Sequence, residues 1–328
     1  MEPFRTIVNC SPSPEKIGYG TPSLMLGSCF AENLGARLQQ LKFNIIVNPF
    51  GIVYHPETVA YQLLRIITGK PYTSRDLKLN NELWHSFDHH GRFSHPDISV
   101  TLERINRELQ QARDQLAYSE WIFVSFGTAW AYRLKGEMCT VANCHKFPAS
   151  DFEHIRFDVN RIYAIWTKTI TRLQRFNPAA KVVFTVSPIR HLRDGAHENQ
   201  LSKSTLLLAV DRLVRKFENI AYFPAYEIVL DELRDYRFYA ENMTHPDTVA
   251  INYIWQRFCK CYMAEDTLQT MKTVEDIVKA AAHRPIHHSS ECRKFAAGYL
   301  EKITKLKQQH PCLDFTEEAK RFEKMECW

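Results

Sequence analysis

Three apolar residues run into a small polar turn at Leu24-Met25-Leu26-Gly27-Ser28-Cys29-Phe30. Leu34, Leu38 and Leu41 follow at helical spacing. This order predicts a buried strand, a tight turn and then a helix. Gly27 suits the turn because glycine accepts backbone angles that are closed to other residues. The stretch therefore indicates one strand–turn–helix unit of an α/β protein.

Ser28 has two interpretations at this position. The N-terminus of a helix favours developing negative charge, so a hydroxyl there could be a nucleophile if a base can reach it. Serine is also a preferred N-cap, and these seven residues alone favour the cap. Cys29 is interpreted as a small buried packing residue rather than a second nucleophile.

The rest of the chain alternates between strand and helix patterns. Further strands are expected at residues 43–47, 121–126, 181–186 and 220–223. Helices are expected at residues 57–67, 102–116, 159–173, 206–217 and 249–258, while residues 69–98 should be irregular and a polar loop should run from Gly127 to about Phe157. This alternation predicts a mostly parallel sheet that is covered on both faces. Ligands bind such sheets beyond the carboxyl ends of the strands, which selects the turns at residues 27–28, 48–51, 127–128 and 187–190.

Composition excludes several classes of protein. The chain has 328 residues, 24% of them charged and 45% hydrophobic, with a net charge of +5. These values are ordinary for a soluble globular protein, and no stripe of basic residues suggests nucleic acid. No signal peptide or membrane span is evident. Nine cysteines without regular spacing indicate reduced thiols, so we expect a cytoplasmic protein.

Neither a cofactor nor a metal is expected. The sequence has no glycine-rich phosphate loop of the dinucleotide or Walker type. One loop carries four histidines whose spacing matches no standard zinc pattern, namely His85, His89, His90 and His95. A solvated loop explains these histidines better than a metal site.

The chain is expected to divide into an α/β domain at residues 1–265 and a helical appendage at residues 266–328. Phe295, Tyr299, Ile303 and Leu306 form an apolar stripe in the second segment. Such a stripe needs a partner surface, either the first domain or a second subunit. A homodimer through these helices is therefore possible.

His245 is the most informative histidine as a base for Ser28. It lies in Glu241-Asn242-Met243-Thr244-His245-Pro246-Asp247, immediately before the last expected helix of the α/β domain. Pro246 and Asp247 suit a helix start, which would hold the imidazole in one place. The plainer interpretation is a surface histidine beside a helix cap.

A series of short motifs resembles the GSCFA family, which is similar to a branch of the SGNH (GDSL-like) hydrolase superfamily. The motifs occur in the family's order and span about residues 22–260. They are Gly27-Ser28-Cys29-Phe30-Ala31, Asn48-Pro49-Phe50-Gly51, Phe126-Gly127-Thr128-Ala129, Asn143-Cys144-His145-Lys146, Ser187-Pro188-Ile189-Arg190-His191 and Met243-Thr244-His245-Pro246. The C-terminal segment also resembles that of Bacteroidetes-type members.

This resemblance implies a flavodoxin-like three-layer α/β/α sandwich with a five-stranded sheet, and serine-dependent hydrolysis of acyl esters. Ser28 matches the superfamily's nucleophile and His245 its base. Gly51 matches a glycine whose N–H joins that of Ser28 in an oxyanion hole. The superfamily contains many deacetylases, so an O-acetylated carbohydrate is the substrate to test first.

Two departures from the superfamily pattern affect this expectation. Asn242 stands where the superfamily has aspartate, and an amide cannot balance the charge of an imidazolium. Glu241, Asp247 or a main-chain carbonyl could orient His245 instead. The third motif has Gly127-Thr128-Ala129 in place of Gly-x-Asn, so the missing amide donor would have to be replaced by Thr128 or Asn143.

Three further residues are candidates for substrate contact. Arg190 and His191 follow a strand, so they should face the cleft, and Arg190 could bind a carboxylate or phosphate. Arg190 could equally brace a loop carboxylate such as Asp194 or Glu198, and His145 could equally pack its own loop. The rival function is that of a catalytically weak protein that binds a carbohydrate or a protein partner on the same scaffold.

Overall fold

The computed structural model describes residues 5–137, 140–283 and 289–326 of the chain. Its contacts divide the chain into two compact units. Unit 1 contains the described residues of 1–10, 22–35 and 45–257, and unit 2 contains those of 11–21, 36–44 and 258–328. The expected boundary at residues 265 and 266 stays a prediction.

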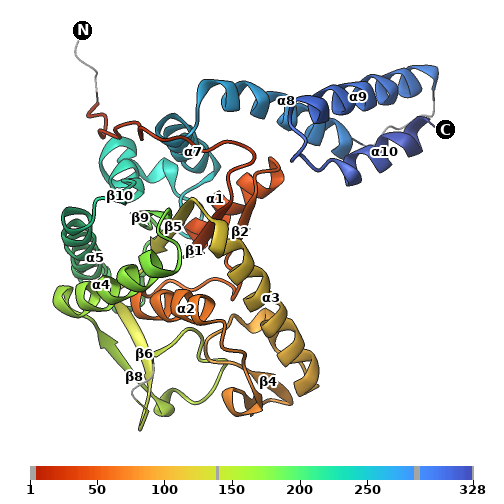
Figure 1. Cartoon of the computed structure of the whole chain (residues 1–328). Helices are drawn as coiled ribbons and strands as arrows, with labels where there is room; N and C mark the ends of the chain where they lie inside the picture. The colour runs from red at the N-terminus through yellow and green to blue at the C-terminus, as the bar shows by residue number, and fades with distance from the viewer. Residues whose placement is uncertain (1–4, 138–139, 284–288, 327–328) are drawn as a thin grey trace. The chain divides into compact units, whose positions relative to one another are not determined.

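The described part of unit 1 is built on a five-stranded parallel sheet (Figure 1). Its strands are β1 (Ser23–Gly27), β2 (Ile45–Val47), β5 (Trp121–Phe126), β9 (Lys181–Val186) and β10 (Ile220–Tyr222). They lie in the order β2-β1-β5-β9-β10, and every neighbouring pair is parallel. This is the doubly wound order of flavodoxin-like sheets, so the expected α/β fold is confirmed. The strand order reverses between β1 and β5, and ligands bind such sheets at that point.

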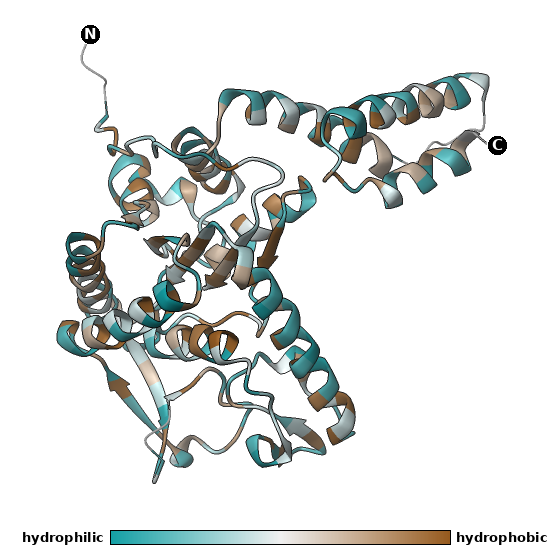
Figure 2. Cartoon of the chain, in the orientation of Figure 1, coloured by the Kyte–Doolittle hydropathy of each residue, from teal (hydrophilic) through white to brown (hydrophobic). Residues whose placement is uncertain are grey.

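Helices cover both faces of this sheet. On one face α2 (Pro56–Thr68), α3 (Ile98–Tyr118), α4 (Val159–Phe176) and α5 (Ala196–Lys216) pack side by side. The other face is covered by the unit 1 portions of α1 (Cys29–Gln40) and α7 (Thr248–Tyr262). Alternate strand residues such as Leu24, Leu26 and Val124 join the core beneath α2 to α5. Figure 2 shows the resulting contrast between apolar strands and the polar outer side of α3.

The expected polar loop after Gly127 is instead a three-stranded antiparallel sheet, and this prediction was wrong. Its strands are β6 (Trp130–Leu134), β7 (Thr140–Val141) and β8 (Phe152–Arg156), in the order β7-β6-β8. Arg133 and Glu153 face each other across β6 and β8 with an N–O distance of 3.0 Å. The prediction relied on long apolar runs, whereas these strands are stabilised in part by cross-strand pairs of polar side chains. A second short hairpin, β3 (Lys78–Asn80) with β4 (Leu83–His85), lies in the region that was expected to be irregular.

Gly27 is fixed by its surroundings, and Gly27→Ala is expected to destabilise the protein by about 3 kcal/mol. Its φ is +133°, and an added Cβ would lie 2.1 Å from the carbonyl oxygen of Ser125. Thermal or urea unfolding of the variant measures this loss. Gly91→Ala is the matched control, because the nearest atom to its added Cβ is 4.0 Å away. Equal stability of the two variants would contradict the assigned turn geometry.

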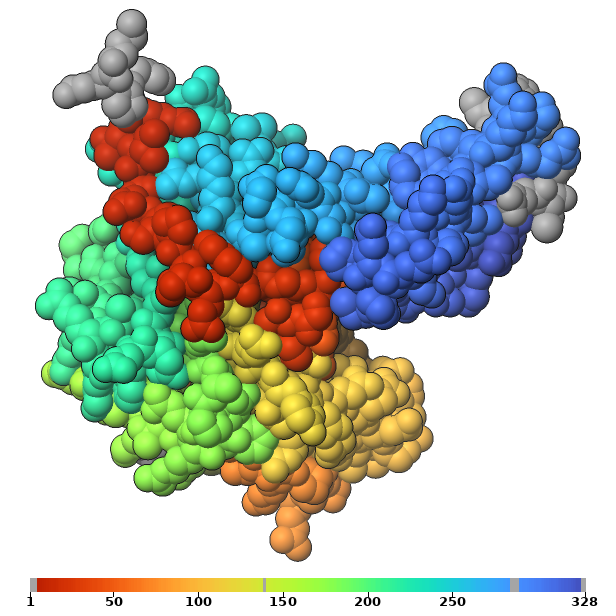
Figure 3. All heavy atoms as spheres, turned by 45° about the horizontal axis from the view of Figure 1, so that its top comes forward, coloured from red at the N-terminus to blue at the C-terminus, as the bar shows by residue number. Residues whose placement is uncertain are grey.

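Unit 2 contains the C-terminal helices α8 (Glu265–Ala282), α9 (Ser290–Gln309) and α10 (Thr316–Glu326). They form a continuous block of atoms in the space-filling view (Figure 3). Ile303 and Leu306 of the expected stripe are buried, and Tyr299 stacks on Phe322 with ring centroids 5.2 Å apart. The appendage is therefore helical with an apolar core of its own, and the homodimer stays a prediction.

The cysteines are not all free thiols. Cys10 and Cys261 are disulfide-bonded. The expectation of reduced thiols is wrong for these two residues, and it was one basis for expecting a cytoplasmic protein. Among the described helices, none combines the length and the apolar character that crossing a membrane requires.

Candidate functional site

The turn after β1 is bonded to the two loops beside it. The N–H of Gly27 donates to Oδ1 of Asn48 at 2.8 Å, and its carbonyl oxygen accepts from the N–H of Val53 at 3.1 Å. On the other side, the N–H of Ser28 donates to the carbonyl oxygen of Ser125 in β5 at 3.2 Å. The turn thus lies at the switch point between β1 and β5, where a ligand is expected.

Ser28 is a buried N-cap of α1. Ser28 is only 3% exposed to solvent. Its Oγ lies 2.8 Å from the Oγ of Ser125 and accepts a hydrogen bond from the N–H of Phe30 at 3.3 Å. An N-cap of this kind satisfies one of the free N–H groups at the helix start. Ser28 therefore has the contacts of the cap, and its role as nucleophile stays a prediction.

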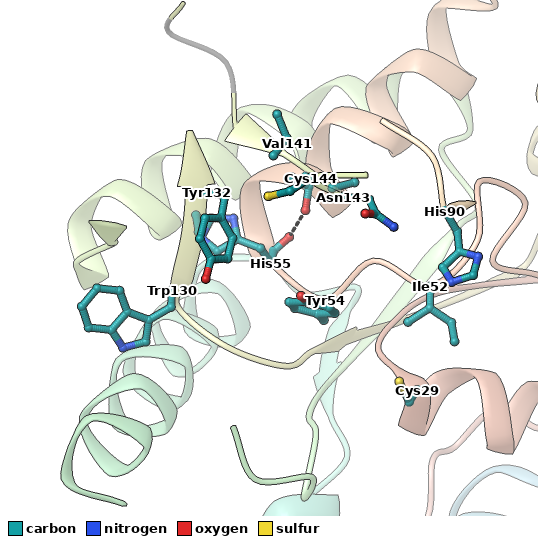
Figure 4. Close-up of a pocket in the computed structure, with 13 residues that line it drawn as sticks. Cys29, Ile52, Tyr54, His55, His90, Trp130, Tyr132, Val141, Asn143 and Cys144 are labelled. Carbon is teal, nitrogen blue, oxygen red and sulfur yellow. Dashed lines mark hydrogen bonds between the residues drawn. The ribbon is translucent and has the colours of Figure 1, made fainter. Parts of the chain in front are cut away.

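Cys29 is the first residue of α1, and it lines a pocket of about 390 Å³ (Figure 4). It is a half-buried free cysteine. The other lining residues come from the loop after β2, from α2, from the loop after β4, and from β6, β7 and the loop that follows β7; they are Ile52, Tyr54, His55, Thr58, His90, Trp130, Ala131, Tyr132, Val141, Ala142, Asn143 and Cys144. Neither Ser28 nor His245 is among them.

The two N–H groups expected to form an oxyanion hole are already bonded within the protein. The N–H of Ser28 is bonded to Ser125, and that of Gly51 donates to the carbonyl oxygen of Asn48 at 2.7 Å. By contrast, the N–H groups of Cys29 and Ile52 have no hydrogen-bond acceptor among the described residues. These unpaired N–H groups follow Ser28 and Gly51 directly in the sequence, and they belong to residues that line the pocket.

Asn143 is the one predicted site residue that lines this pocket. Its Oδ1 accepts from the N–H of His145 at 2.9 Å, which leaves its Nδ2 without an acceptor in the described part of the chain. Thr128 and Asn143 were the two replacements considered for the missing amide donor. Asn143 is the one that has a free amide among the residues that line the pocket. Thr128 is buried, and its hydroxyl is bonded to Ser202 at 2.9 Å.

His145 and Gly127 have packing roles in the structure. The Nε2 of His145 lies 2.8 Å from the carbonyl oxygen of Ser86, and burial lowers the pKa of His145 to about 4. Gly127 lies against Tyr54, where an added Cβ would be only 2.7 Å from the Tyr54 Cβ. The N–H of Gly127 donates to the carbonyl oxygen of Tyr54 at 2.7 Å. Both residues pack behind residues that line the pocket, and neither lines it.

The amide of Asn242 sets the tautomer of His245. Its Oδ1 accepts from the N–H of Thr244, the hydroxyl of Thr244 and the N–H of His245, each at 3.0 Å. Three donors on one oxygen fix the amide orientation, so Nδ2 faces Nδ1 of His245 at 2.9 Å. An NH₂ group only donates, so neutral His245 must accept at Nδ1 and carry its proton on Nε2. In this state Nε2 can donate a hydrogen bond but cannot accept a proton.

Arg190 and His191 connect the His245 loop to the pocket. The N–H of Arg190 donates to the carbonyl oxygen of Thr244 at 3.0 Å, and its guanidinium lies over the ring of Tyr239 at 4.1 Å. His191 packs on Tyr54, with ring centroids 5.4 Å apart. Burial, with smaller contributions from Lys203 and His245, lowers the pKa of His191 to about 3. His191 is therefore neutral at pH 7, and Arg190 braces its own loop through aromatic rings rather than through Asp194 or Glu198.

The histidine-rich loop uses its rings to hold itself together. The two ring nitrogens of His85 lie 2.7 Å from the Oγ of Ser94 and 3.1 Å from the carbonyl oxygen of Asn80. His89 is fully buried, and its Nδ1 lies 2.8 Å from the Oγ of Ser86. Within the described ranges, no three histidine, cysteine or acidic side chains are grouped so that they could hold a metal ion.

Sequence reasoning missed most of the pocket. It overlooked Tyr54 and His55, interpreted Cys29 as a buried packing residue, and placed His90 in a solvated loop. One sequence signal was available for Cys29. If Ser28 is the N-cap, then Cys29 is the first residue of the helix, and its side chain is the one that can face the cavity. The predicted residues His245, Asn242, Arg190 and His191 form a neighbouring cluster at the end of β9 instead.

Comparison with known proteins identifies the family. The profile of the GSCFA family matches residues 22–258, and that of the GSCFA domain protein, C-terminal domain, matches residues 274–326. The chain therefore belongs to the GSCFA family, as its motifs predicted. A comparison with curated proteins gave no match.

Among solved structures, one similar chain is the crystal structure of a carbohydrate esterase family 3 from Talaromyces cellulolyticus. It has 6% sequence identity and a TM-score of 0.35, and the alignment covers 78% of this chain and 99% of that chain. A likeness at this score carries no argument about the residues or the activity of the present chain.

Proposed function

We propose that this chain hydrolyses acyl esters in the pocket beside the N-terminus of α1. The observation that carries the proposal is the set of unspent hydrogen-bond donors on the pocket residues Cys29, Ile52 and Asn143. Donors held in this way favour a carbonyl oxygen that becomes negative as a nucleophile attacks. The pocket also lies at the carboxyl edge of the sheet, where ligands of such folds bind.

The finer expectation has Ser28 as the attacking residue and His245 as its base. Two observations weigh against that pair. The hydroxyl of Ser28 is bonded to Ser125 and Phe30, and no hydrogen bond joins Ser28 to His245 within the described residues. Attack by Ser28 would therefore require its cap to open first. The substrate that the motifs favour, an O-acetylated carbohydrate, does not depend on which atom attacks.

The rival function also has an observation in its favour. Asn242 leaves His245 as a hydrogen-bond donor at Nε2, which suits binding of an acceptor oxygen better than proton removal. A protein that binds an acetylated carbohydrate without cleaving it would use the cluster around His245 beside the pocket. Turnover separates the two functions, because only the enzyme releases acetate.

The test measures acetate release from acetylated xylan and p-nitrophenol release from p-nitrophenyl acetate by the wild-type chain. We expect Asn143→Leu to lower the rate about a hundredfold, as loss of one oxyanion donor does in other acyl-transfer enzymes. Asn160→Leu, on the exposed face of α4, is the matched control. The rival function holds if the wild type releases acetate no faster than unfolded protein does, and calorimetry detects tight binding of an acetylated xylo-oligosaccharide.

A further inference from the structure

We propose that the attacking atom is Sγ of Cys29, so that the chain is a cysteine-dependent acyl hydrolase whose Ser28 is a structural cap. This inference rests on the proposed function and names the nucleophile within it. Ser28 and Cys29 are adjacent, but they face different surroundings. The hydroxyl is bonded inward to Ser125 and Phe30, while Cys29 lines the pocket.

The place of Cys29 in α1 suits a nucleophile. As the first helical residue it lies at the positive end of the helix dipole, where a thiolate and an oxyanion are both stabilised. Its N–H donates to no other described residue, so it is available to an oxygen of the group that the thiol attacks. Burial raises the pKa of the Cys29 thiol, Glu32 adds to the shift, and the backbone N–H of Cys29 opposes it. We therefore expect the thiol to be neutral at rest and to lose its proton as it reacts.

A second feature of the pocket, independent of the thiol, indicates a ligand with acceptor oxygens. His55 lines the pocket and is 3% exposed. Its Nδ1 accepts from the N–H of Glu57 at 3.2 Å, so the proton of the neutral ring is on Nε2. Burial lowers the pKa of His55 to about 3, which keeps the ring neutral, while the nearby backbone of Ala129 opposes the shift. The buried Nε2 has no hydrogen-bond partner of good geometry among the described residues.

The backbone of Ala129 is close to this ring but gives Nε2 no well-aligned hydrogen bond, and a poorly satisfied buried donor costs up to roughly 1–3 kcal/mol, so a ligand oxygen that reaches Nε2 would be favoured. The oxygen atoms of an acyl ester or a sugar would supply this acceptor. Asn143 Nδ2 lines the same cavity and has the same need. The pocket is thus prepared for an oxygen-rich ligand next to a thiol.

The other pocket thiol is a weaker candidate. Cys144 follows Asn143 in a loop and has no helix N-terminus beside it. Burial raises the pKa of Cys144 to about 11. The phenol of Tyr54 lies near both thiols: burial raises its pKa most, with further contributions from Cys144 and Cys29, while Arg193 opposes the shift. Tyr54 therefore keeps its proton and can donate a hydrogen bond toward the acyl group.

The reaction has two steps. In the first, Sγ of Cys29 bonds to the acyl carbon, the C–O bond to the alcohol breaks, and the proton from Sγ ends on the departing alcohol oxygen. In the second, water adds to the thioester carbon, the C–S bond breaks, and one water proton returns to Sγ while the acid is released. No group is oxidised or reduced, and water is the co-reactant.

The experiment traps the intermediate on the full-length chain. The wild-type chain is mixed with p-nitrophenyl acetate, quenched in acid and digested, and the acetylated peptide is identified by mass spectrometry. We expect an acetyl group on Cys29 that neutral hydroxylamine removes, as it removes thioesters but not serine esters. We expect Cys29→Ala to lower turnover by about a hundredfold or more. Cys292→Ala, a free half-buried cysteine of α9, is the matched control and should keep the wild-type rate.

Two further variants and a stability measurement keep the result interpretable. Ser28→Ala should retain most of the turnover although it loses a cap worth about 1 kcal/mol of stability. Cys29→Ser places a hydroxyl at the same point, and any acetyl group it traps should resist neutral hydroxylamine. Unfolding of each variant is measured, so that a folding defect is not read as a lost nucleophile.

The outcomes separate this inference from the proposed function. If the wild type hydrolyses the ester and Cys29→Ala is equally fast, or if the acetyl group is found on Ser28, the thiol assignment is overturned and the hydrolase stands. If the acetyl thioester forms on Cys29 but is not released, the thiol assignment stands and the hydrolase does not. If neither an adduct nor turnover is found, both are overturned.

Discussion

Asn242→Asp is expected to move the ring proton of His245 from Nε2 to Nδ1, and to raise the rate of ester hydrolysis only if this ring takes the proton of the attacking atom; the reverse change in Ser-His-Asp enzymes costs about ten-thousandfold. The amide of Asn242 holds Nδ1 of His245 as an acceptor and so places the ring proton on Nε2. A carboxylate in the same place would accept from Nδ1–H instead. One of its oxygens could keep the three donors of Thr244 and His245, and the other would bind the ring. The lone pair would then lie on Nε2, which could take a proton.

The measurement is kcat/KM for p-nitrophenyl acetate between pH 5 and 9 in wild type, Asn242→Asp and Asn242→Ala. Asn242→Ala removes the amide and leaves the hydroxyl of Thr244, 3.0 Å from Nδ1, as the polar neighbour of that nitrogen, so it serves as the matched control. A rate that is unchanged or lower would mean that another group orients His245 or that this ring does not take the proton.

Lys203→Met is expected to lower the free energy of unfolding by about 5 kcal/mol, because it removes the donors for two buried carbonyls. Lys203 is fully buried in α5, and its Nζ donates to the carbonyl oxygens of Gly127 at 2.6 Å and Ser187 at 2.7 Å. These carbonyls end β5 and β9, beside the pocket and the His245 loop. Without the ammonium both strand ends would lose their common anchor.

The stability of the wild type should also depend on pH through this lysine. Burial lowers the pKa of Lys203 to about 7, whereas the unfolded value is about 10.4. Between these values the unfolded chain binds a proton that the folded chain does not, so raising the pH favours the folded state. The contribution should grow by about 1.4 kcal/mol per pH unit at most and should be absent in Lys203→Met.

Urea unfolding at pH 7, 8 and 9 measures both effects. Lys168→Met, at an exposed position of α4, is the matched control and should change neither the midpoint nor its pH dependence. A gap between wild type and Lys203→Met that stays constant across this range would mean that Lys203 keeps an ordinary pKa in the folded protein.

The sequence was sufficient for the parallel sheet because its signals are local and strong. Long apolar runs such as residues 121–126 and 181–186 have no solution other than a buried strand, and the helices between them carry regular apolar stripes. The antiparallel strands β6 and β8 were missed because each has polar residues on one side and draws its stability from its neighbour. Pairing partners of this kind are not visible until the chain is folded.

The site was harder to predict than the sheet for a different reason. The turn at Gly27 was located correctly, but whether Ser28 or Cys29 lines the cavity depends on the helix cap, and the capping role of Ser28 was the one sequence signal that pointed to Cys29. Lys203 was not considered at all, because a lysine on an amphipathic helix usually points to solvent. Asn143 was foreseen as a possible amide donor, and its free Nδ2 in the pocket is consistent with that prediction.

The small antiparallel sheet has a consequence for how substrate preference could change. Trp130, Tyr132 and Val141 line the pocket, yet they belong to an insertion whose strands pair only with one another. The parallel strands carry the turn at Gly27, and among the described residues none of their hydrogen-bonded ladders includes β6, β7 or β8. Part of the pocket lining is therefore encoded apart from the parallel sheet, and if the pocket binds the proposed ester, exchanging aromatic residues on β6 would change its preference for acyl groups or sugars while the central sheet stays intact.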